Sequence, residues 1–430
     1  MPAKDTRNPT VSRVLEDRTI VELIYDPEAR RTALAVCSPD GSVSIEAEVA
    51  VGSGEQLVPY DAANTLLANG CVLLPSAVGE AMSTGALLKK IQGFLHAYLD
   101  LPDTFAAIAA HYVLLTWVYD AFSDLPYLRF RGDFGTGKTR ALLTIGSICY
   151  KPFFASGAST VSPIFHILDA FQGTLLLDEA DFRFSEATAP LTKLLNNGTT
   201  RGMPVLRTMT NRHRELNPQA FRVFGPKVVS MREQFSDLAL ESRFFTCETG
   251  GRPLRPDVPI YLPDAFHSEA LALRNALLAW RFRSRFSVGP NPSRAAVGVS
   301  PRYRQTSLSL LSLVEDSGLR ERIGRELAGY EARVLNERAD SFEAAMLAAI
   351  EESFEASTAH HAAIQDITTR FNDRAADELG RVVTNKWVGT FVRQRLRLAT
   401  FKTGGVFVVP TSERAKIAAL CERYGIRRAA

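Results

Sequence analysis

The sequence lacks paired cysteines, long apolar runs and an apolar leader. Its 430 residues include five cysteines, at positions 37, 71, 149, 247 and 421, and none of them form a C-x-x-C pair. This spacing argues against a zinc ribbon or a disulfide framework and is typical of a reducing compartment. The first twenty residues are polar, and the most apolar segment, Phe105–Tyr119, contains His111 and is shorter than the roughly 18–20 residues of a membrane span. We therefore expect a cytoplasmic protein with no membrane contact, and a buried helix at Phe105–Tyr119.

Acidic and basic residues are unevenly distributed, although the total formal charge is only +3. Residues 1–86 hold 6 basic and 12 acidic residues, a net charge of −6, whereas residues 357–430 hold 13 and 6, a net charge of +7. Hydrophobic residues make up 46% and charged residues 23%, close to a globular average, which argues against long disordered stretches. The basic C-terminal end is where we expect a polyanion to bind.

Hydrophobic periodicity divides the chain into four regions. Strand-like runs dominate residues 19–60, helical spacing begins at Leu87, and an α/β pattern continues to about Cys247. Helical sequence follows, and the last 70 residues combine helices with one hairpin signal. We predict an α/β protein with four domains: a small acidic β-rich domain (1–86), an α/β core (87–250), helices that cover it (251–356) and a C-terminal domain (357–430).

A glycine-rich loop follows the strand predicted at Tyr127–Phe130. Its sequence, G-D-F-G-T-G-K-T, fits the phosphate-loop pattern G-x-x-x-x-G-K-[ST]. The predicted nucleotide contacts are Gly132, Asp133, Phe134, Gly135, Thr136, Gly137, Lys138 and Thr139. Backbone N–H groups and the N-terminus of the next helix would surround the phosphates, and Lys138 would reach the β- and γ-phosphates. Thr139 would bind Mg²⁺, so ATP and Mg²⁺ are the expected cofactors.

An apolar strand forty residues further on ends in two acids, Asp178 and Glu179. A carboxylate at the tip of a strand beside the phosphate loop can hold Mg²⁺ through water, which is the role predicted for Asp178. Glu179 would polarise the attacking water, and this favours a hydrolase over a kinase. The letters D-E-A-D also spell a helicase-family signature, but the other motifs of that family are absent and the second half of the chain is helical.

Polar residues elsewhere could complete the site. Ser230, at the tip of the strand predicted at Lys227–Ser230, could orient the water, and Arg232 is the alternative. Arg243 precedes the last core strand and suits an arginine finger that reaches the nucleotide of a neighbouring subunit. Arg304, or else Arg302, opens a helix that could bring an arginine to the γ-phosphate. For Arg243 the alternative is a surface ion pair. For Arg304 and Arg302 it is a solvated first turn of the helix.

Together these motifs resemble an AAA+ ATPase, in particular the MCM-type replicative helicases. Their G-D-x-G-T-x-K-[ST] loop matches Gly132–Thr139, their S-R-F finger matches Ser242–Phe244, and their lid Arg-Gln matches Arg304-Gln305. Their D-E-x-D acids match Asp178, Glu179 and Asp181. The chain also resembles the helicase-like ATPases of bacterial phages and mobile elements. The resemblance covers about residues 87–320 and implies an AAA+ core with a helical lid, ATP hydrolysis and a hexameric ring.

The sequence departs from the MCM pattern in three places. Position 230 lacks the sensor asparagine, and residues 160–174 leave no room for the extra hairpin of MCM proteins. The cysteine pattern excludes their N-terminal zinc and OB-fold half. The motifs therefore support ATP hydrolysis more directly than they support helicase activity.

Two basic segments are candidates for DNA contact. Strands predicted at Met203–Met209 and Ala220–Phe224 flank a basic tip, Arg212-His213-Arg214, that would project into the channel of a ring. The C-terminal domain, residues 357–430, looks like a winged helix, in which one helix enters the major groove and the hairpin wing touches the backbone. Its candidate contacts are Lys386, Arg393 and Lys402. An exposed basic loop and a winged helix used for protein contact are the respective alternatives.

The sequence therefore supports two functions of different kinds. The first is a DNA-dependent AAA+ motor, a ring-forming replicative-type helicase with DNA, further copies of itself and replication proteins as partners. The second is an ATP-dependent initiator or helicase loader that switches but does not translocate. A metabolic kinase is disfavoured by Glu179 and by the finger and lid arginines.

Overall fold

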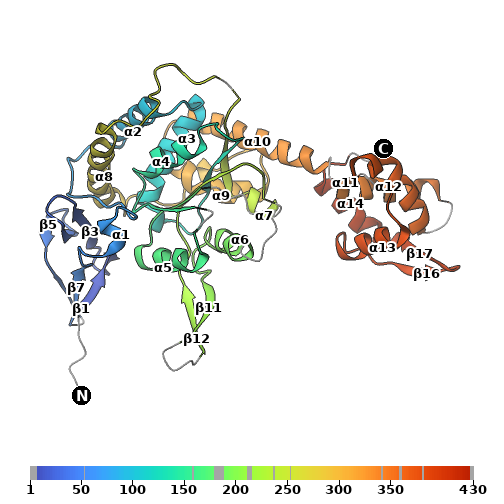
Figure 1. Ribbon diagram of the computed structural model, residues 1–430, viewed down its shortest axis with the longest axis horizontal. Coiled ribbons are helices and arrows are strands. Elements are labelled where there is room, and N and C mark those ends of the chain that lie inside the picture. Colours follow the sequence, from blue (N-terminus) through green and yellow to red (C-terminus); the bar gives the residue numbers. More distant parts are fainter. Residues whose placement is uncertain are drawn as a thin grey trace. The chain divides into compact units, whose positions relative to one another are not determined.

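The computed structural model of the chain is a mixed α/β structure that divides into two compact units, Met1–Leu327 and Ala328–Ala430 (Figure 1). The described residues are 7–52, 54–156, 159–178, 188–210, 216–235, 238–251, 253–339, 342–357, 361–379 and 382–426. No helix within these ranges is long and apolar enough to cross a membrane.

The N-terminal region forms two small sheets. Their strands are β1 (Arg7–Thr10), β2 (Ser12–Val14), β3 (Ile20–Asp26), β4 (Arg31–Cys37), β5 (Val43–Glu46), β6 (Val49–Val51) and β7 (Glu55–Pro59), followed by the short helix α1 (Thr65–Ala68). One sheet has the order β2-β3-β4-β5 and the other β1-β7-β6. The strands predicted in residues 19–37 are thus present as β3 and β4. Their side chains are mostly buried because the sheet packs on the rest of the larger unit.

A buried ionic network ties this N-terminal sheet to the core. Glu22 of β3 pairs with Lys151 (Nζ–Oε2 2.8 Å) and with Arg281 (Nε–Oε1 2.8 Å). Arg281 also pairs with Asp120 (2.9 Å), which pairs with Arg285 (2.7 Å). Burial disfavours the charge on Glu22, but Lys151 and Arg281 outweigh burial and lower its pKa. Burial lowers the pKa of Lys151 to about 8, even though Glu22 opposes that shift.

The core of the larger unit is a parallel five-stranded sheet with the order β14-β8-β13-β10-β9. Its strands are β8 (Tyr127–Arg131), β9 (Phe153–Ser156), β10 (Leu175–Asp178), β13 (Lys227–Met231) and β14 (Phe244–Glu248). The helices α4 (Lys138–Gly146), α5 (Val161–Phe171), α6 (Thr188–Asn197) and α7 (Leu238–Glu241) connect them. The Leu-Leu-Leu run of β10 is apolar, as expected for a parallel strand that is covered on both faces. β13 therefore lies between the strand that precedes the glycine-rich loop and the strand that ends at Asp178.

Helices that precede the sheet in the sequence pack against helices that follow it. They are α2 (Thr84–Tyr98), α3 (Asp103–Trp117), α8 (Ala265–Ser284) and α9 (Pro301–Leu313); α10 (Ser317–Ala339) follows them in the sequence and continues across the boundary between the two units. Phe94 and Tyr98 of α2 contact Phe266 of α8, and α3 contacts α8 and α9. α3 is the buried helix predicted at Phe105–Tyr119, and almost all of its residues are buried.

The smaller unit has a core of its own. Its elements are α11 (Phe342–Ala356), β15 (His361–Ala363), α12 (Ile364–Leu379), α13 (Asn385–Gln394), β16 (Phe401–Thr403), β17 (Val406–Pro410) and α14 (Arg414–Arg423), and the sheet order is β15-β17-β16. Ile350, Phe371, Val388 and Val409 are buried together. α11 belongs to this core, although the boundary expected from sequence falls after it, at 356/357.

A fully buried ion pair stabilises the start of β14. The Arg129 guanidinium donates to both carboxylate oxygens of Glu241 (2.8 and 2.5 Å) and to Thr246 Oγ1, and it lies 4.8 Å from the Phe244 ring centroid. Neither partner's side chain is exposed to solvent. The charge of Arg129 is stabilised by the Glu241 carboxylate, because water does not reach this position to solvate the guanidinium.

Glu241→Gln is expected to lower the free energy of unfolding by about 3–5 kcal/mol, because it leaves Arg129 buried without a counter-charge. Urea unfolding of the full chain, followed by circular dichroism, measures this loss. Glu248→Gln is the matched control: its partner Arg131 lies on the same strand as Arg129, but Glu248 is 42% exposed, so a loss below about 1 kcal/mol is expected. Equal losses in the two variants would contradict the prediction.

Candidate nucleotide site and nucleic-acid contacts

The glycine-rich loop connects the end of β8 to the first turn of α4. Gly135 and Gly137 have φ values of 76° and 86°, a left-handed backbone that glycine adopts without steric cost. At Gly132 the constraint is space, because a Cβ atom would lie 2.3 Å from Thr249 Oγ1. The loop thus brings its backbone to the N-terminus of α4, where N–H groups can bind an anion.

Lys138 is held at this loop by the loop itself. Its Nζ donates to the carbonyl oxygens of Gly132 (2.8 Å) and Asp133 (2.6 Å). The ammonium is therefore positioned before any phosphate arrives, and phosphate oxygens can replace these carbonyls as its acceptors.

Asp178, at the end of β10, connects α4 and β13 at the site. Its Oδ2 accepts a hydrogen bond from Thr139 Oγ1 (2.9 Å) in the first turn of α4, and its Oδ1 accepts one from Ser230 Oγ. Ser230 lies on β13, between β10 and β8, the strand that precedes the glycine-rich loop. A hydroxyl and a carboxylate oxygen are hard ligands that suit Mg²⁺, which in proteins is commonly held by one or two carboxylates and by substrate phosphates. Thr139 and Asp178 therefore fit the predicted metal site.

Other predicted residues lie elsewhere or beyond the described ranges. Glu179 and Asp181 are outside the described residues. The alternative to Ser230, Arg232, lies beside the loop, with its guanidinium 5.9 Å from the Phe134 ring centroid. Arg302 and Arg304 are exposed in the first turn of α9.

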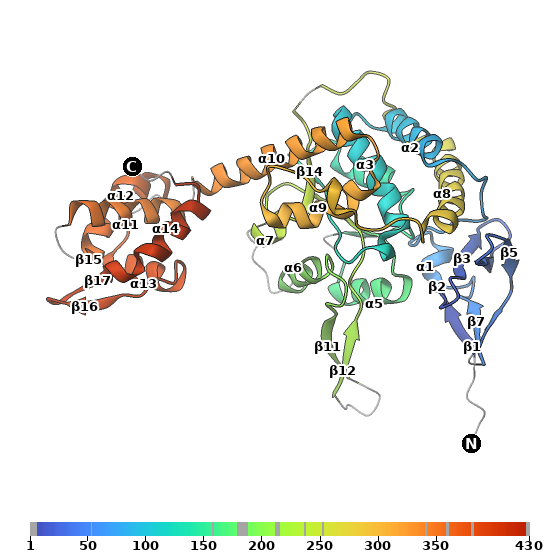
Figure 2. The ribbon, with the colours of Figure 1, turned by 180° about the vertical axis from the view of Figure 1, so that it is seen from behind.

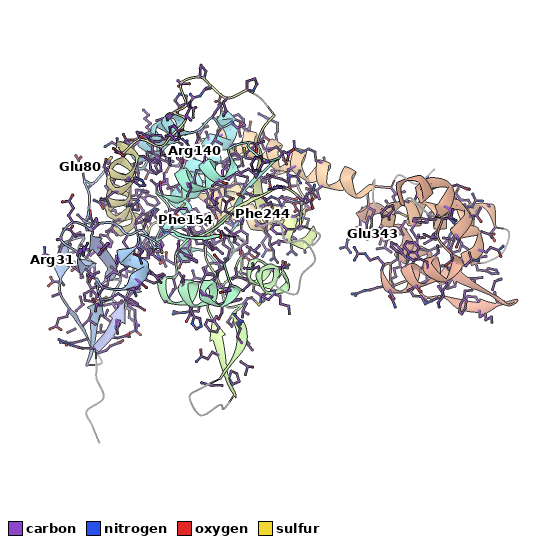
Figure 3. The ribbon with its side chains drawn as sticks, in the orientation of Figure 1. Arg31, Glu80, Arg140, Phe154, Phe244 and Glu343 are labelled. Carbon is purple, nitrogen blue, oxygen red and sulfur yellow. The ribbon has the colours of Figure 1, made fainter. Side chains whose placement is uncertain are left out.

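Sequence reasoning missed the segment after β14, which contacts the loop and α4. Thr249 Oγ1 lies 2.7 Å from Thr136 Oγ1, although the two residues are 113 positions apart in the sequence. The same Thr249 hydroxyl donates to the Arg131 carbonyl (3.1 Å). Arg140, labelled in Figure 3, donates to the carbonyls of Pro259 (3.2 Å) and Ile260 (2.5 Å). Only the Thr-Gly-Gly sequence at the end of a core strand could have indicated this contact.

Arg243 lies at the opposite edge of the sheet from Lys138. It directly precedes Phe244, which pairs with Tyr127 at the start of β8, whereas the loop follows the end of β8. Each strand has five residues, so about 15 Å of extended chain separates the two edges. Arg243 donates to Asn196 Oδ1 (2.6 Å) and to the carbonyl of Leu195 (3.4 Å) at the end of α6. It therefore cannot reach a nucleotide bound by its own loop.

Lys227 is buried near Arg243, at the start of β13. Its Nζ donates to the carbonyls of Val223 (2.9 Å), Gly225 (2.9 Å) and Gly198 (3.5 Å), and it lies 4.8 Å from the Tyr127 ring centroid. Burial and, to a smaller extent, the nearby charge of Arg243 lower the pKa of Lys227 to about 7. Both the hairpin that precedes β13 and the end of α6 are thus held by this amine.

Stability should rise with pH because of Lys227. The unfolded chain, with an ordinary lysine pKa near 10.4, binds more protons than the folded chain above a folded-state pKa of about 7. The free energy of unfolding is therefore expected to increase by about 2 kcal/mol between pH 7 and pH 9, and Lys227→Met should remove that increase. Urea unfolding of wild type and Lys227→Met at both pH values gives the pH-dependent change in unfolding free energy for each protein. Contributions from Lys151 and other groups that both proteins share cancel when the two changes are subtracted. Parallel pH profiles would contradict the prediction.

The predicted basic hairpin is present, and its tip is not described. β11 (Val205–Thr210) pairs with β12 (Leu216–Phe221) as a separate two-stranded sheet that extends away from the core in both views (Figures 1 and 2). Arg222 pairs with Asp169 of α5 (2.9 Å) at its base. Arg212, His213 and Arg214 lie outside the described residues.

The smaller unit brings two of its predicted contacts together. Thr384 caps α13, and Arg393 near the end of that helix donates to Thr400 Oγ1 (3.3 Å). Arg393 also lies 5.6 Å from the ring centroid of Phe407, which pairs across the hairpin with Lys402. Lys386 is exposed at the other end of α13. The hairpin strand β16 begins at Phe401, and Leu398 before it is buried in the core of the unit.

This parallel sheet, with a glycine-rich loop after one strand and an acid at the tip of another, has the architecture of an α/β nucleotide-binding protein. No protein-family model and no curated protein matches the chain. Solved structures that are similar include the apo A form of the NrS-1 C-terminal region (11% identity, TM-score 0.37, 91% of this chain and 96% of that one). The SCCmec type IV Cch active helicase has 11% identity, a TM-score of 0.38 and coverage of 96% and 95%. The JCV helicase has 15% identity, a TM-score of 0.24 and coverage of 59% and 61%.

Proposed function

We propose that this protein is an ATP-hydrolysing DNA motor of the AAA+ type that works as a ring, resembling MCM-type helicases and those of phages and mobile elements. One observation carries the proposal. The Asp178 carboxylate accepts hydrogen bonds from Thr139 beside the phosphate loop and from Ser230 on the intervening strand. A metal-binding hydroxyl, an acid and a third polar group thus meet at one edge of the sheet, as phosphoryl transfer to water requires.

Each residue then has a defined role in hydrolysis. Lys138 and the N–H groups at the start of α4 would hold the β- and γ-phosphates, and Thr139 and Asp178 would hold Mg²⁺, which would neutralise developing charge. Glu179 would accept a proton from the attacking water as the water oxygen bonds to the γ-phosphorus, while the bond to the β,γ-bridging oxygen breaks and ADP leaves. Ser230, predicted from the sequence to orient the water, instead donates a hydrogen bond to Asp178 and would fix the orientation of that carboxylate.

The position of Arg243 supports the proposal of a ring. Because this arginine is at the sheet edge away from its own loop, its guanidinium can act on a nucleotide only in a second copy of the chain. We propose that it stabilises the transferring phosphoryl group across each subunit interface. Arg304, exposed on α9, is the proposed lid arginine. A closed ring would give each of six subunits one such interface.

DNA contact completes the motor. The β11–β12 hairpin would carry Arg212, His213 and Arg214 to DNA phosphates in the channel. The smaller unit, proposed to be a winged helix, would add Lys386, Arg393 and Lys402. An initiator or loader that uses the same ATP site without translocation is the second candidate. The projecting hairpin, which an initiator does not need, favours the motor.

Wild-type protein is expected to hydrolyse ATP faster with DNA present and to displace a strand from a forked duplex. Phosphate release and a fluorescent displacement assay measure the two activities. Arg212→Ala/Arg214→Ala should keep basal hydrolysis and lose displacement, since phosphate contacts at the tip carry the movement. If the wild type hydrolyses ATP with DNA bound but never displaces a strand, the motor hypothesis is wrong, and the initiator or loader is the function that still fits.

A further inference from the structure

The hairpin of the smaller unit exposes aromatic side chains that its core does not use. Phe401, Val406 and Phe407 are 46%, 41% and 48% exposed. Phe401 pairs with Val408 and Lys402 pairs with Phe407, and cross-strand partners share a face of a hairpin. Side chains alternate along a strand, so Phe407 and Lys402 share the face of Val409, which is buried in the core, and they lie further along the hairpin than that core. Because Phe407 is only half-buried, part of its ring stays accessible to a ligand.

Cations surround this ring. The Arg393 guanidinium lies 5.6 Å from the Phe407 ring centroid and is fixed by its hydrogen bond to Thr400. Lys402 lies directly across the hairpin. The sequence contains no aspartate or glutamate between Glu378 and Glu413, and that stretch has six basic residues. This end of the hairpin therefore complements a polyanion that also has flat apolar groups.

We propose that this end of the hairpin binds unpaired DNA, with Phe407 as the platform on which a base stacks and with Arg393 and Lys402 on the adjacent phosphates. A duplex offers the hairpin only its backbone, for which cations suffice, whereas an unpaired strand presents the faces of its bases. Arg393 holds the Phe407 ring in place before the strand arrives. The smaller unit would thus prefer single strands and forks, a specificity that rests on the proposed DNA function.

Phe407→Leu in the full chain tests this. Fluorescence anisotropy with an oligo-dT strand and with a blunt duplex of equal length is expected to show about 5- to 100-fold weaker binding of the single strand. Binding of the duplex should change by less than about twofold, and the salt dependence should be unchanged. Phe401→Leu is the matched control, because this ring is equally exposed but lies on the other face, so it should leave single-strand binding intact.

Lys402→Ala separates stacking from charge. It should weaken both DNAs and reduce the salt slope by about one. Equal losses on single strand and duplex for Phe407→Leu, or unchanged binding of both, would overturn the inference and leave the proposed motor in place. Wild-type protein that binds neither DNA would overturn the DNA part of the proposed function as well, and the ATPase assay would then report separately on the nucleotide site.

Discussion

Lys138→Ala is expected to lower kcat for ATP hydrolysis by at least about 100-fold, the cost of losing a preorganised charge at developing phosphate charge. The Nζ atom is already positioned by the carbonyls of Gly132 and Asp133, so its full charge is available to the γ-phosphate. Removal of the side chain leaves the loop backbone, whose conformation depends on its glycines. Phosphate release at saturating ATP measures the loss.

The control is Lys89→Ala, which removes an equal charge from an exposed position on α2. It should hydrolyse ATP at the wild-type rate. A Lys138→Ala protein that retains turnover within about threefold of wild type would rule out the phosphate role of this lysine.

Arg243→Ala is expected to reduce hydrolysis by about 10³–10⁵-fold while the loop still binds ATP, because an arginine finger acts on the transition state. Binding of a fluorescent ATP analogue and phosphate release separate the two effects. Asn196→Ala is the structural control. It removes one acceptor of the guanidinium at the end of α6 but keeps the arginine, so its hydrolysis should stay near the wild-type rate.

Subunit mixing tests whether Arg243 acts in trans. Lys138→Ala subunits keep their arginine and Arg243→Ala subunits keep their lysine, so a mixed ring contains interfaces with both groups. With random assembly and independent sites, an equal mixture of the two inactive proteins should recover about a quarter of the wild-type rate. A mixture as inactive as its components would exclude a finger that acts between subunits.

The parts of the fold that were predictable are those that local chemistry constrains. The glycine-rich loop needs left-handed backbone at Gly135 and Gly137, and the buried strand before Asp178 must be apolar on both faces. β12 was only partly predicted, because it is a polar, solvent-facing strand that contains Pro218. In a two-stranded ribbon, proline is tolerated and the alternating apolar signal is weak.

The arrangement of the site depends on contacts between distant residues, which no local pattern encodes. Sequence alone left Ser230 and Arg232 as alternatives for the polar group at the tip of β13. The structure shows that the Ser230 hydroxyl donates a hydrogen bond to Asp178, whereas the Arg232 guanidinium lies beside the Phe134 ring. Thr249 and Phe407 were missed for the same reason. Each contacts a predicted residue through a pairing of strands or helices that a linear pattern does not contain.

The ionic network around Glu22 limits the modularity of the protein. Residues 1–86 supply the carboxylate of Glu22, whereas Lys151 and Arg281, its two cationic partners, come from the rest of the larger unit. A truncated chain that starts at residue 87 would retain every proposed catalytic group, but its Lys151 would lose its buried carboxylate partner. In evolution, too, this sheet could be exchanged for another only if these three charges changed together.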